Sequence, residues 1–204
     1  MHAKKHWESV YTAKGQKEVS WYRPHLDTSL ALIEHLIPSH TAAIIDVGAG
    51  ASSLVDDLAQ RRYANITVLD ISETALRAAK ERLGPDSARI QWLAADVCET
   101  DLPPDYYDLW HDRAVFHFLT LPEQRTSYVA RAAASVKRNG HLIIATFGPE
   151  GPRRCSGLDT VRYDATTLEA EFGAQFALTE SRIEWHTTPS GIQQQFLYCV
   201  LKRV

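Results

Sequence analysis

Residues 42–50 read Ala-Ala-Ile-Ile-Asp-Val-Gly-Ala-Gly, and this stretch decides how the rest of the chain is interpreted. Its apolar run ends in two glycines, which is typical of a buried parallel strand that turns tightly into a helix. Further short β-rich runs follow at 66–69, 89–93, 107–110 and 141–147. Segments with helical periodicity lie between them, at 52–60, 72–83 and 123–136. This alternation predicts a parallel sheet that is covered by helices on both faces.

The pattern changes in the C-terminal part of the chain. A helix is expected at 165–172, and two longer strands are expected at 176–185 and 193–201. The strands flank a short turn that contains proline and glycine, which predicts an antiparallel hairpin. The hairpin would extend the sheet to seven strands.

The whole chain is expected to form a single domain. An amphipathic helix at 27–37 precedes the first strand and follows an unusually aromatic segment. We therefore predict a Rossmann-like α/β domain over residues 1–204, with a mostly parallel seven-stranded sheet, helices on both faces and a C-terminal antiparallel hairpin. It divides into an N-terminal segment and helix (1–40), a core (41–147) and a C-terminal helix and hairpin (148–204).

Composition narrows the function classes. The chain has 204 residues, 45% of them hydrophobic, and a net charge of -3, and no window concentrates Lys and Arg into a stripe that could track phosphates. Nucleic acid is therefore not expected as a partner. No apolar run approaches the length of a membrane span, so no membrane association is expected either. Three widely spaced cysteines without a C-x-x-C pair fit a reducing cytoplasm.

The glycine pair points to a ligand at the carboxyl edge of the sheet. Gly48 and Gly50 let a ligand approach the backbone, although a tight turn from strand to helix needs glycine in any case. Asp70 closes the second strand and Asp96 follows the third, so both reach the same edge. Asp70 could accept hydrogen bonds from two ribose hydroxyls, or it could cap the helix that begins near Ser72.

Nicotinamide binding is the first alternative for this edge. A dinucleotide fingerprint requires a third glycine at position 53, where this chain has Ser53. A carboxylate at Asp46 would also repel a pyrophosphate. A nicotinamide-dependent reductase and a non-catalytic nucleoside-binding module stay open as remote alternatives.

Together, Asp46, Gly48 and Gly50 resemble the first motif of the class I S-adenosylmethionine-dependent methyltransferases, acidic-x-Gly-x-Gly. The resemblance implies S-adenosyl-L-methionine as the cofactor. It places Asp46 near the methionine part, Asp70 at the ribose and Asp96 at the adenine amine. The complete set of expected cofactor-binding residues in the core is Asp46, Gly48, Ala49, Gly50, Asp70, Ile71, Asp96 and Val97. The chain departs from many family members at Ser52, where they carry a third glycine.

The segment after the fourth strand is the expected acceptor side. It carries His111, Asp112, Arg113 and His117 among apolar neighbours, an arrangement that is costly unless the polar groups are paired or hydrated. We predict these four as catalytic residues. The alternatives are an ion pair that only shapes the loop and histidines without a function.

The Trp110-x-Asp112-Arg113 pattern is similar to that of the thiopurine and related thiol methyltransferases. That resemblance implies that Arg113 helps to hold an anionic acceptor. His111 departs from the family pattern. The Pro-Pro-aromatic motif of amino-group nucleic-acid methylases is missing, as is the clustered set of carboxylates for magnesium, so no metal is expected.

The aromatic residues near the N-terminus are expected to cover the cofactor. Trp7, Tyr11, Trp21 and Tyr22 could form a lid, with Trp7 and Trp21 in the cofactor site, or they could form a separate hydrophobic cluster. We therefore expect a methyltransferase that acts on a sulfur, nitrogen or oxygen atom of a small molecule. A protein lysine methyltransferase is the alternative, because such enzymes resemble the cofactor loop equally well.

Overall fold

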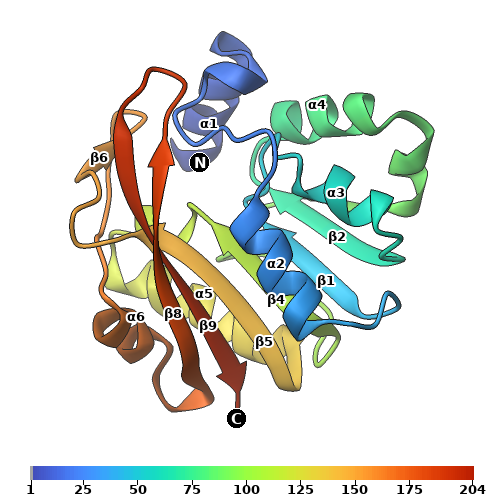
Figure 1. The fold of residues 1–204 in the computed structure, drawn as a ribbon, viewed down its shortest axis with the longest axis vertical. Coiled ribbons are helices and arrows are strands. Elements are labelled where there is room, and N and C mark those ends of the chain that lie inside the picture. Colours follow the sequence, from blue (N-terminus) through green and yellow to red (C-terminus); the bar gives the residue numbers. More distant parts are fainter. Residues whose placement is uncertain (1) are drawn as a thin grey trace.

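The computed structural model describes residues 2–204 and shows one seven-stranded sheet, ordered β3-β2-β1-β4-β5-β9-β8 (Figure 1). Met1, the first residue of the expected N-terminal part, lies outside the described residues. Strands β1 to β5 run parallel, and β9 and β8 form the antiparallel hairpin, so the predicted fold class is confirmed. The strands are β1 (Ala43–Val47), β2 (Asn65–Asp70), β3 (Gln91–Ala94), β4 (Tyr107–Arg113), β5 (Val136–Phe147), β8 (Phe176–Thr187) and β9 (Gln193–Arg203).

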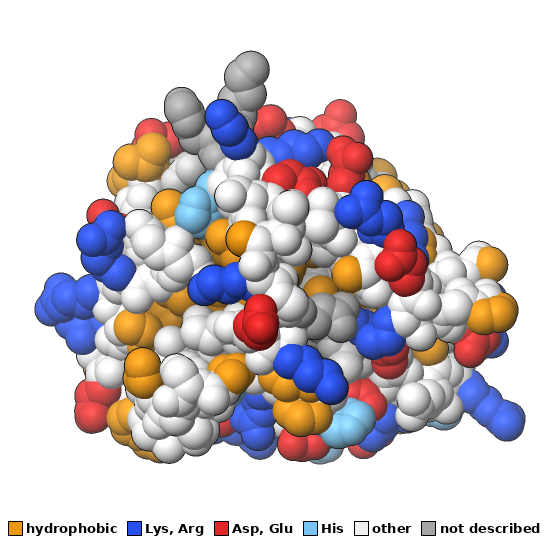
Figure 2. Space-filling view, turned by 90° about the horizontal axis from the view of Figure 1, so that it is seen from above, with side chains coloured by type: hydrophobic (Ala, Val, Ile, Leu, Met, Phe, Trp, Pro, Cys, Tyr) orange, Lys and Arg blue, Asp and Glu red, His pale blue; other side chains and the backbone are white. Residues whose placement is uncertain are grey.

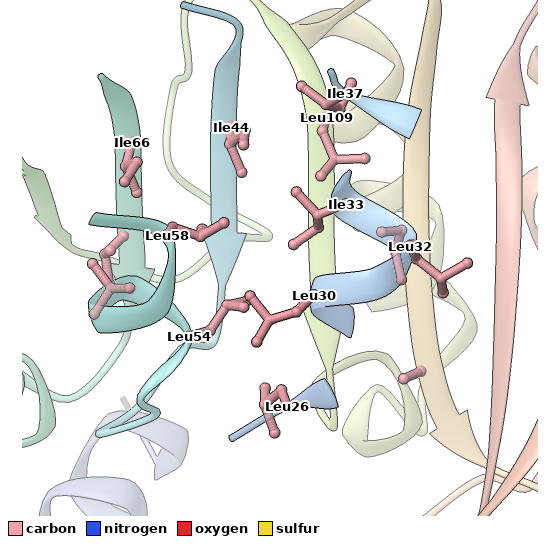
Figure 3. Packing of buried hydrophobic residues seen from close by; sticks show 14 of the residues in the cluster. Leu26, Leu30, Leu32, Ile33, Ile37, Ile44, Leu54, Leu58, Ile66 and Leu109 are labelled. Carbon is pink, nitrogen blue, oxygen red and sulfur yellow. The ribbon is translucent and has the colours of Figure 1, made fainter. Parts of the chain in front are cut away.

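Helices cover both faces of the sheet. One apolar core lies between the sheet and α2, α3 and α4, and the other lies between the sheet and α5 and α6. Figure 3 shows Leu30 of α2 beside Leu54 of α3, Ile33 of α2 beside Leu109 of β4, and Leu58 of α3 near Ile44 of β1, all in the first core. The helices are α1 (His2–Ala13), α2 (Asp27–Leu36), α3 (Leu54–Gln60), α4 (Glu73–Leu83), α5 (Pro122–Ser135) and α6 (Ala165–Phe172).

The strand order places a crevice between β1 and β4. The chain moves outward from β1 to β2 and β3 and then returns to β4 on the other side of β1. Ligands in open α/β sheets bind beyond the carboxyl ends of the strands at such a reversal. Asp46 and His111 are neighbours in the β1–β4 register, so both strands aim polar residues at this point.

Several elements differ from the prediction, among them β5, which begins at Val136 and not at 141. β4 continues to Arg113, although the strand was expected to end at Trp110. Residues 2–13 form the helix α1, because the apolar residues Trp7, Val10 and Tyr11 follow helical spacing, which we had read only as an aromatic segment. A small hairpin, β6 (Arg154–Cys155) and β7 (Leu158–Asp159), was not expected.

Within residues 2–204, none of the helices has both the length and the apolar character needed to cross a membrane.

Candidate active site

The glycine-rich loop after β1 depends on its two glycines. Gly48 and Gly50 have φ values of 61° and 56°, in the left-handed region that favours glycine. A Cβ atom at Gly48 would lie 1.8 Å from Cγ2 of Val115, and one at Gly50 would lie 2.1 Å from the hydroxyl oxygen of Tyr11. The loop therefore cannot accept a side chain at either position without moving its neighbours.

Asp70 fixes this loop to the end of β2. Its Oδ2 atom accepts a hydrogen bond from the backbone N–H of Gly50 (2.7 Å), and its Oδ1 atom accepts one from Ser72 (2.7 Å). Burial raises the pKa of Asp70 to about 6, although the two N–H donors oppose that rise. The α4 helix is capped by Ser72, whose hydroxyl accepts the N–H of Ala75 at 3.2 Å, and not by Asp70. Asp70 lines a cavity of about 350 Å³ and keeps lone pairs that can accept hydrogen bonds from ligand hydroxyls.

Two cavities meet over the carboxyl ends of β1 and β4. The larger has a volume of about 350 Å³, within the range of roughly 300–1,000 Å³ that is usual for small-molecule sites. The smaller measures about 40 Å³. The predicted cofactor-binding residues that line the larger cavity are Trp7, Trp21, Gly48, Asp70, Ile71, Asp96 and Val97. Those that line the smaller cavity are Trp21, Asp46, Gly48 and Ala49.

Asp96 also lines the larger cavity. Its Oδ1 atom accepts the N–H of Cys98 at 2.9 Å, which orients the carboxylate at the end of β3. Burial, together with the charge of Asp96, raises the pKa of the Cys98 thiol to about 12. Cys98 therefore lines the cavity as a protonated, unreactive thiol.

Asp46 begins a buried chain of polar groups. Its Oδ1 atom lies 2.7 Å from Nδ1 of His111, and Nε2 of His111 lies 2.9 Å from the Ser29 hydroxyl. A carboxylate only accepts hydrogen bonds, so Nδ1 donates to Asp46. The Oδ2 atom of Asp46 is buried and has no partner among the described residues. His111 is thus occupied on both ring nitrogens, while Asp46 keeps one free acceptor.

The four predicted catalytic residues are not brought together on one face. Because β4 extends through Arg113, side chains alternate, and Asp112 points away from His111 and Arg113. Asp112 accepts the N–H groups of Val115 (2.9 Å) and Phe116 (3.1 Å), and it lines neither cavity. These contacts favour a structural role for Asp112 in the turn after β4.

His117 is also held in a structural setting. Its ring stacks on Phe147 at 4.1 Å between centroids, and Nδ1 accepts the backbone N–H of Phe147 at 3.1 Å. Burial and the charge of Arg113 lower the pKa of His117 to about 3. The ring is therefore neutral at neutral pH and carries its proton on Nε2, which makes it a poor general base. Its catalytic role stays a prediction that this geometry does not favour.

Arg113 lines both cavities, and two hydrogen bonds from its guanidinium fix its orientation. Its Nε atom donates to the hydroxyl of Tyr198 (3.1 Å), and Nη1 donates to the backbone carbonyl of Trp21 (3.0 Å). The guanidinium carbon lies 4.5 Å from the ring centroid of Phe196. Of the four predicted catalytic residues, Arg113 has the geometry that best suits contact with a ligand.

The N-terminal helix α1 covers the larger cavity. Trp7 packs edge-to-face on Phe118 (5.0 Å between centroids) and on Trp21 (5.8 Å). Glu8 accepts the backbone N–H groups of Glu73 (2.6 Å) and Thr74 (3.3 Å) in the first turn of α4. Glu8 and Phe118 were missed from the sequence, because neither belongs to a motif. In Figure 2, which looks down on this end of the molecule, apolar side chains lie between scattered charges of both signs.

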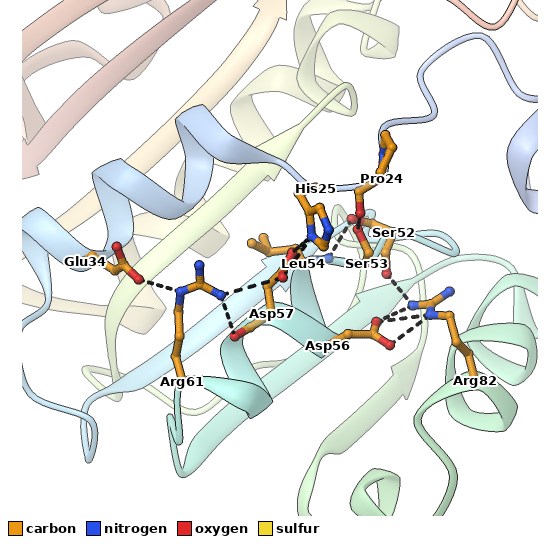
Figure 4. A network of polar contacts seen from close by, with 10 residues as sticks. All are labelled: Pro24, His25, Glu34, Ser52, Ser53, Leu54, Asp56, Asp57, Arg61 and Arg82. Carbon is orange, nitrogen blue, oxygen red and sulfur yellow. Dashed lines mark hydrogen bonds and ion pairs between the residues drawn. The ribbon is translucent and has the colours of Figure 1, made fainter.

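A polar network fixes the chain just beyond the glycines. Arg82 of α4 donates to the backbone carbonyl of Ala51 at 2.9 Å. Figure 4 shows that it also donates to the carbonyl of Ser52 (2.7 Å) and that the Ser53 hydroxyl donates to the carbonyl of Pro24 (2.7 Å). The glycine-rich loop is therefore attached to α4 on one side and to the N-terminal segment on the other. An arginine in a helix gives no sequence signal of this kind, so Arg82 was also missed.

These residues fit an S-adenosylmethionine site. The glycines open the backbone to a ligand, Asp70 and Asp96 present oriented carboxylates, and Asp46 has a buried acceptor without a partner. A buried unpaired acceptor costs free energy, and a ligand ammonium would offset that cost. Among residues 2–204, no three His, Cys, Asp or Glu side chains are arranged to hold a metal ion.

Comparison with known proteins agrees with this geometry. A model of the methyltransferase domain family matches residues 45–144. An uncharacterized methyltransferase of Mycobacterium tuberculosis is 32% identical over 117 residues, which is 57% of this chain and 56% of the relative. The eEF1A lysine and N-terminal methyltransferase of Bos taurus is 28% identical over 135 residues, which is 65% of this chain and 19% of the relative. The chain thus spans little more than half the length of the first of these relatives.

Solved structures share the fold over nearly the whole chain. The protein in a structure of the conversion of a disulfide bond into a thioacetal group during echinomycin biosynthesis has a TM-score of 0.79 at 17% identity, covering 99% of this chain and 92% of the other. Other structures of this fold are S-adenosylmethionine-dependent methyltransferases, some with S-adenosylhomocysteine bound. The similarity to the thiopurine methyltransferases stays a prediction. With the methyltransferase-domain match over residues 45–144 and this fold, the chain is similar to the class I S-adenosylmethionine-dependent methyltransferases.

Proposed function

We propose that this protein transfers the methyl group of S-adenosylmethionine to a sulfur, nitrogen or oxygen atom of a small molecule. The observation that carries this proposal is the shape of the larger cavity. Beyond the cofactor residues, its wall continues through Phe118, Leu119 and Leu158, and α1 covers it with Trp7. A covered apolar pocket suits a small acceptor better than it suits a side chain that projects from a protein surface.

The residues of the site position the reactants and exclude water. S-adenosylmethionine, when bound, supplies a methyl group that its sulfonium already activates. Asp70 and Asp96 would hold the nucleoside, while the aromatic residues of α1 keep water from the cavity. Neither predicted histidine is placed as a base, because His111 is hydrogen-bonded at both nitrogens and the pKa of His117 is lowered to about 3. This arrangement favours acceptors that are nucleophilic without a histidine base, such as thiols.

A protein lysine methyltransferase is the second candidate. It is supported by the relative from Bos taurus, which is a lysine and N-terminal methyltransferase, although the match covers 19% of that protein. The structure related to echinomycin biosynthesis supports sulfur chemistry on a small molecule instead. The lack of a metal, the lack of a nucleic-acid partner and the cytoplasmic location stay predictions.

The first test is calorimetry with S-adenosylhomocysteine and NADH. We expect binding heat for S-adenosylhomocysteine and none for NADH. In the Asp70→Ala variant we expect the affinity for S-adenosylhomocysteine to fall about 100-fold or more, because two hydrogen bonds to a charged group, worth roughly 1.5–3 kcal/mol each, are lost. Binding of NADH alone would support the reductase alternative.

The second test is transfer of a labelled methyl group to a panel of small thiols, amines and hydroxyl compounds, with protein extract in parallel. We expect label in the small-molecule fraction. Label confined to a protein band would overturn the proposed acceptor class in favour of a protein substrate. Binding without transfer to any acceptor would support the non-catalytic module.

A further inference from the structure

The smaller cavity contains two buried charged side chains that are each left with one polar atom unpaired. Asp46 of β1 is 2% exposed and Arg113 of β4 is 8% exposed. Oδ2 of Asp46 and Nη2 of Arg113 are buried and have no hydrogen-bond partner among the described residues. Both side chains line the cavity of about 40 Å³ beside the Gly48 backbone. An acceptor and a donor of opposite charge thus face the same small space.

Arg113 is oriented by the protein but its charge is not neutralised there. Two of its nitrogens are engaged, Nε with Tyr198 and Nη1 with the carbonyl of Trp21, and both partners are uncharged. Within residues 2–204, no carboxylate oxygen lies within 4.0 Å of its guanidinium. A buried guanidinium without a counter-charge is costly, so this setting suits an anion supplied by a ligand.

The amino-acid end of the cofactor has the matching chemistry. It carries an ammonium and a carboxylate on the same carbon, so a free carboxylate oxygen and a free guanidinium N–H in one small cavity can each bind one of them. We propose that Arg113 binds the carboxylate of the amino-acid end of S-adenosylmethionine, across from Asp46. This inference rests on the cofactor assigned in the proposed function.

The proposal changes the role that the thiopurine resemblance implies for Arg113. An anionic acceptor at this arginine would also face the unpaired carboxylate of Asp46, which would repel it. The cavity of about 40 Å³ is much smaller than the neighbouring one of about 350 Å³, so it suits one end of a ligand better than a whole acceptor molecule. With Arg113 bound to the cofactor, the acceptor part of the larger cavity keeps mainly apolar walls, which suits an uncharged acceptor.

Arg23 is the rival for the same carboxylate, because it lines the same cavity. Its Nη1 atom already donates to Oε1 of Glu184 at 2.8 Å, and its side chain is 28% exposed. The charge of Arg23 is therefore paired within the protein, whereas that of Arg113 is not. Arg113 is the stronger candidate on this ground.

The experiment compares two probes, S-adenosylhomocysteine and its decarboxylated analogue, by calorimetry. The wild-type protein should bind S-adenosylhomocysteine about 10- to 100-fold more tightly, as expected for one charge-assisted contact. In Arg113→Met that preference should disappear, while the affinity for the decarboxylated probe stays within about twofold. Arg113→Lys should keep part of the preference. Arg89→Met, a matched loss of charge in an exposed ion pair, should leave both affinities unchanged.

Several results would overturn the proposal. An equal loss of affinity for both probes in Arg113→Met would indicate a merely structural role. Unchanged affinities for both probes, with a raised KM for the acceptor, would indicate that Arg113 binds the acceptor. Selective loss of the carboxylate preference in Arg23→Met, with Arg113→Met unaffected, would assign the role to Arg23. If Arg113→Met does not fold, the test rests on the ratio of the two probe affinities in the wild-type protein and in Arg113→Lys. A wild-type ratio near one overturns the assignment. Failure of the wild-type protein to bind S-adenosylhomocysteine would instead contradict the proposed function.

Discussion

The turns that follow β2 and β4 are built alike, but only the carboxylate of the first, Asp70, faces the larger cavity. Asp70 and Asp112 are both buried, each accepts two backbone N–H groups, and burial raises the pKa of each to about 6. Asp112 also accepts the hydroxyl of Tyr128 on α5 at 2.6 Å, and it is 0% exposed. Asp70 has no such third partner among the described residues and lines the larger cavity. A carboxylate at this edge becomes a ligand site only where the neighbouring layer leaves it uncovered.

Asp112→Asn should have the largest effect on stability. The amide cannot accept all three donors, so at least one buried N–H or hydroxyl group loses its partner, and we expect a loss of about 2–4 kcal/mol in the free energy of unfolding. Affinity for S-adenosylhomocysteine should change less than about twofold. Urea denaturation and calorimetry measure the two quantities.

Asp70→Asn is the matched variant for this comparison. It should cost about 1–2 kcal/mol of stability, because only the backbone donors of Gly50 and Ser72 are affected. It should weaken S-adenosylhomocysteine binding by about 10-fold or more. If Asp112→Asn weakened binding as much as Asp70→Asn does, the division of roles between the two turns would be wrong.

The contrast between the two turns also shows what the sequence could reveal. Motif spacing was enough to place Asp46, Asp70 and Asp96 at the cavities over one sheet edge, because residues at the ends of parallel strands meet there whatever the details of packing. Spacing was not enough to predict where the Asp112 side chain points, because that direction depends on whether β4 ends at Trp110 or continues. Successive side chains of a strand point to opposite faces, so once β4 includes Asp112, its side chain lies on the face opposite to His111 and Arg113.

The helix α1 shows a second limit of prediction from sequence. Its apolar residues Trp7 and Tyr11 were expected near the cofactor, and they do line the larger cavity. Its attachment through Glu8 depends on backbone N–H groups of α4, and no residue pattern in either segment signals that contact. Contacts between a side chain and a distant backbone group become visible only in the structure.

The pH dependence of cofactor binding should distinguish the two carboxyls. In the protein alone, the raised pKa of Asp70 means that folding favours the protonated form, so its contribution to stability increases as pH falls from about 6 toward 4. Ligand hydroxyls need the ionised form, so binding should weaken over the same range. We expect S-adenosylhomocysteine affinity to be about 10-fold lower at pH 5 than at pH 7. Asp112→Asn should keep this dependence and Asp70→Asn should remove it; a dependence that persists in Asp70→Asn would contradict the assignment.

The smallest expected effect on S-adenosylhomocysteine affinity concerns α1, the helix that covers the cavity lined by Asp70. Asp112 is hydrogen-bonded to Tyr128 of α5, whereas Asp70 lines the cavity that α1 covers, and Glu8 attaches α1 to the first turn of α4. Glu8→Gln removes a charge that caps this helix, which is worth about 1 kcal/mol. S-adenosylhomocysteine affinity should then fall about fivefold, and the amides of α1 should exchange with solvent faster. Lys4→Met, which removes only an exposed ion pair with Glu73, should change the affinity less than about twofold. Equal effects of the two variants on affinity would mean that the aromatic contacts alone hold α1 in place. The helix over Asp70 would then be as firmly attached as α5, the helix over Asp112.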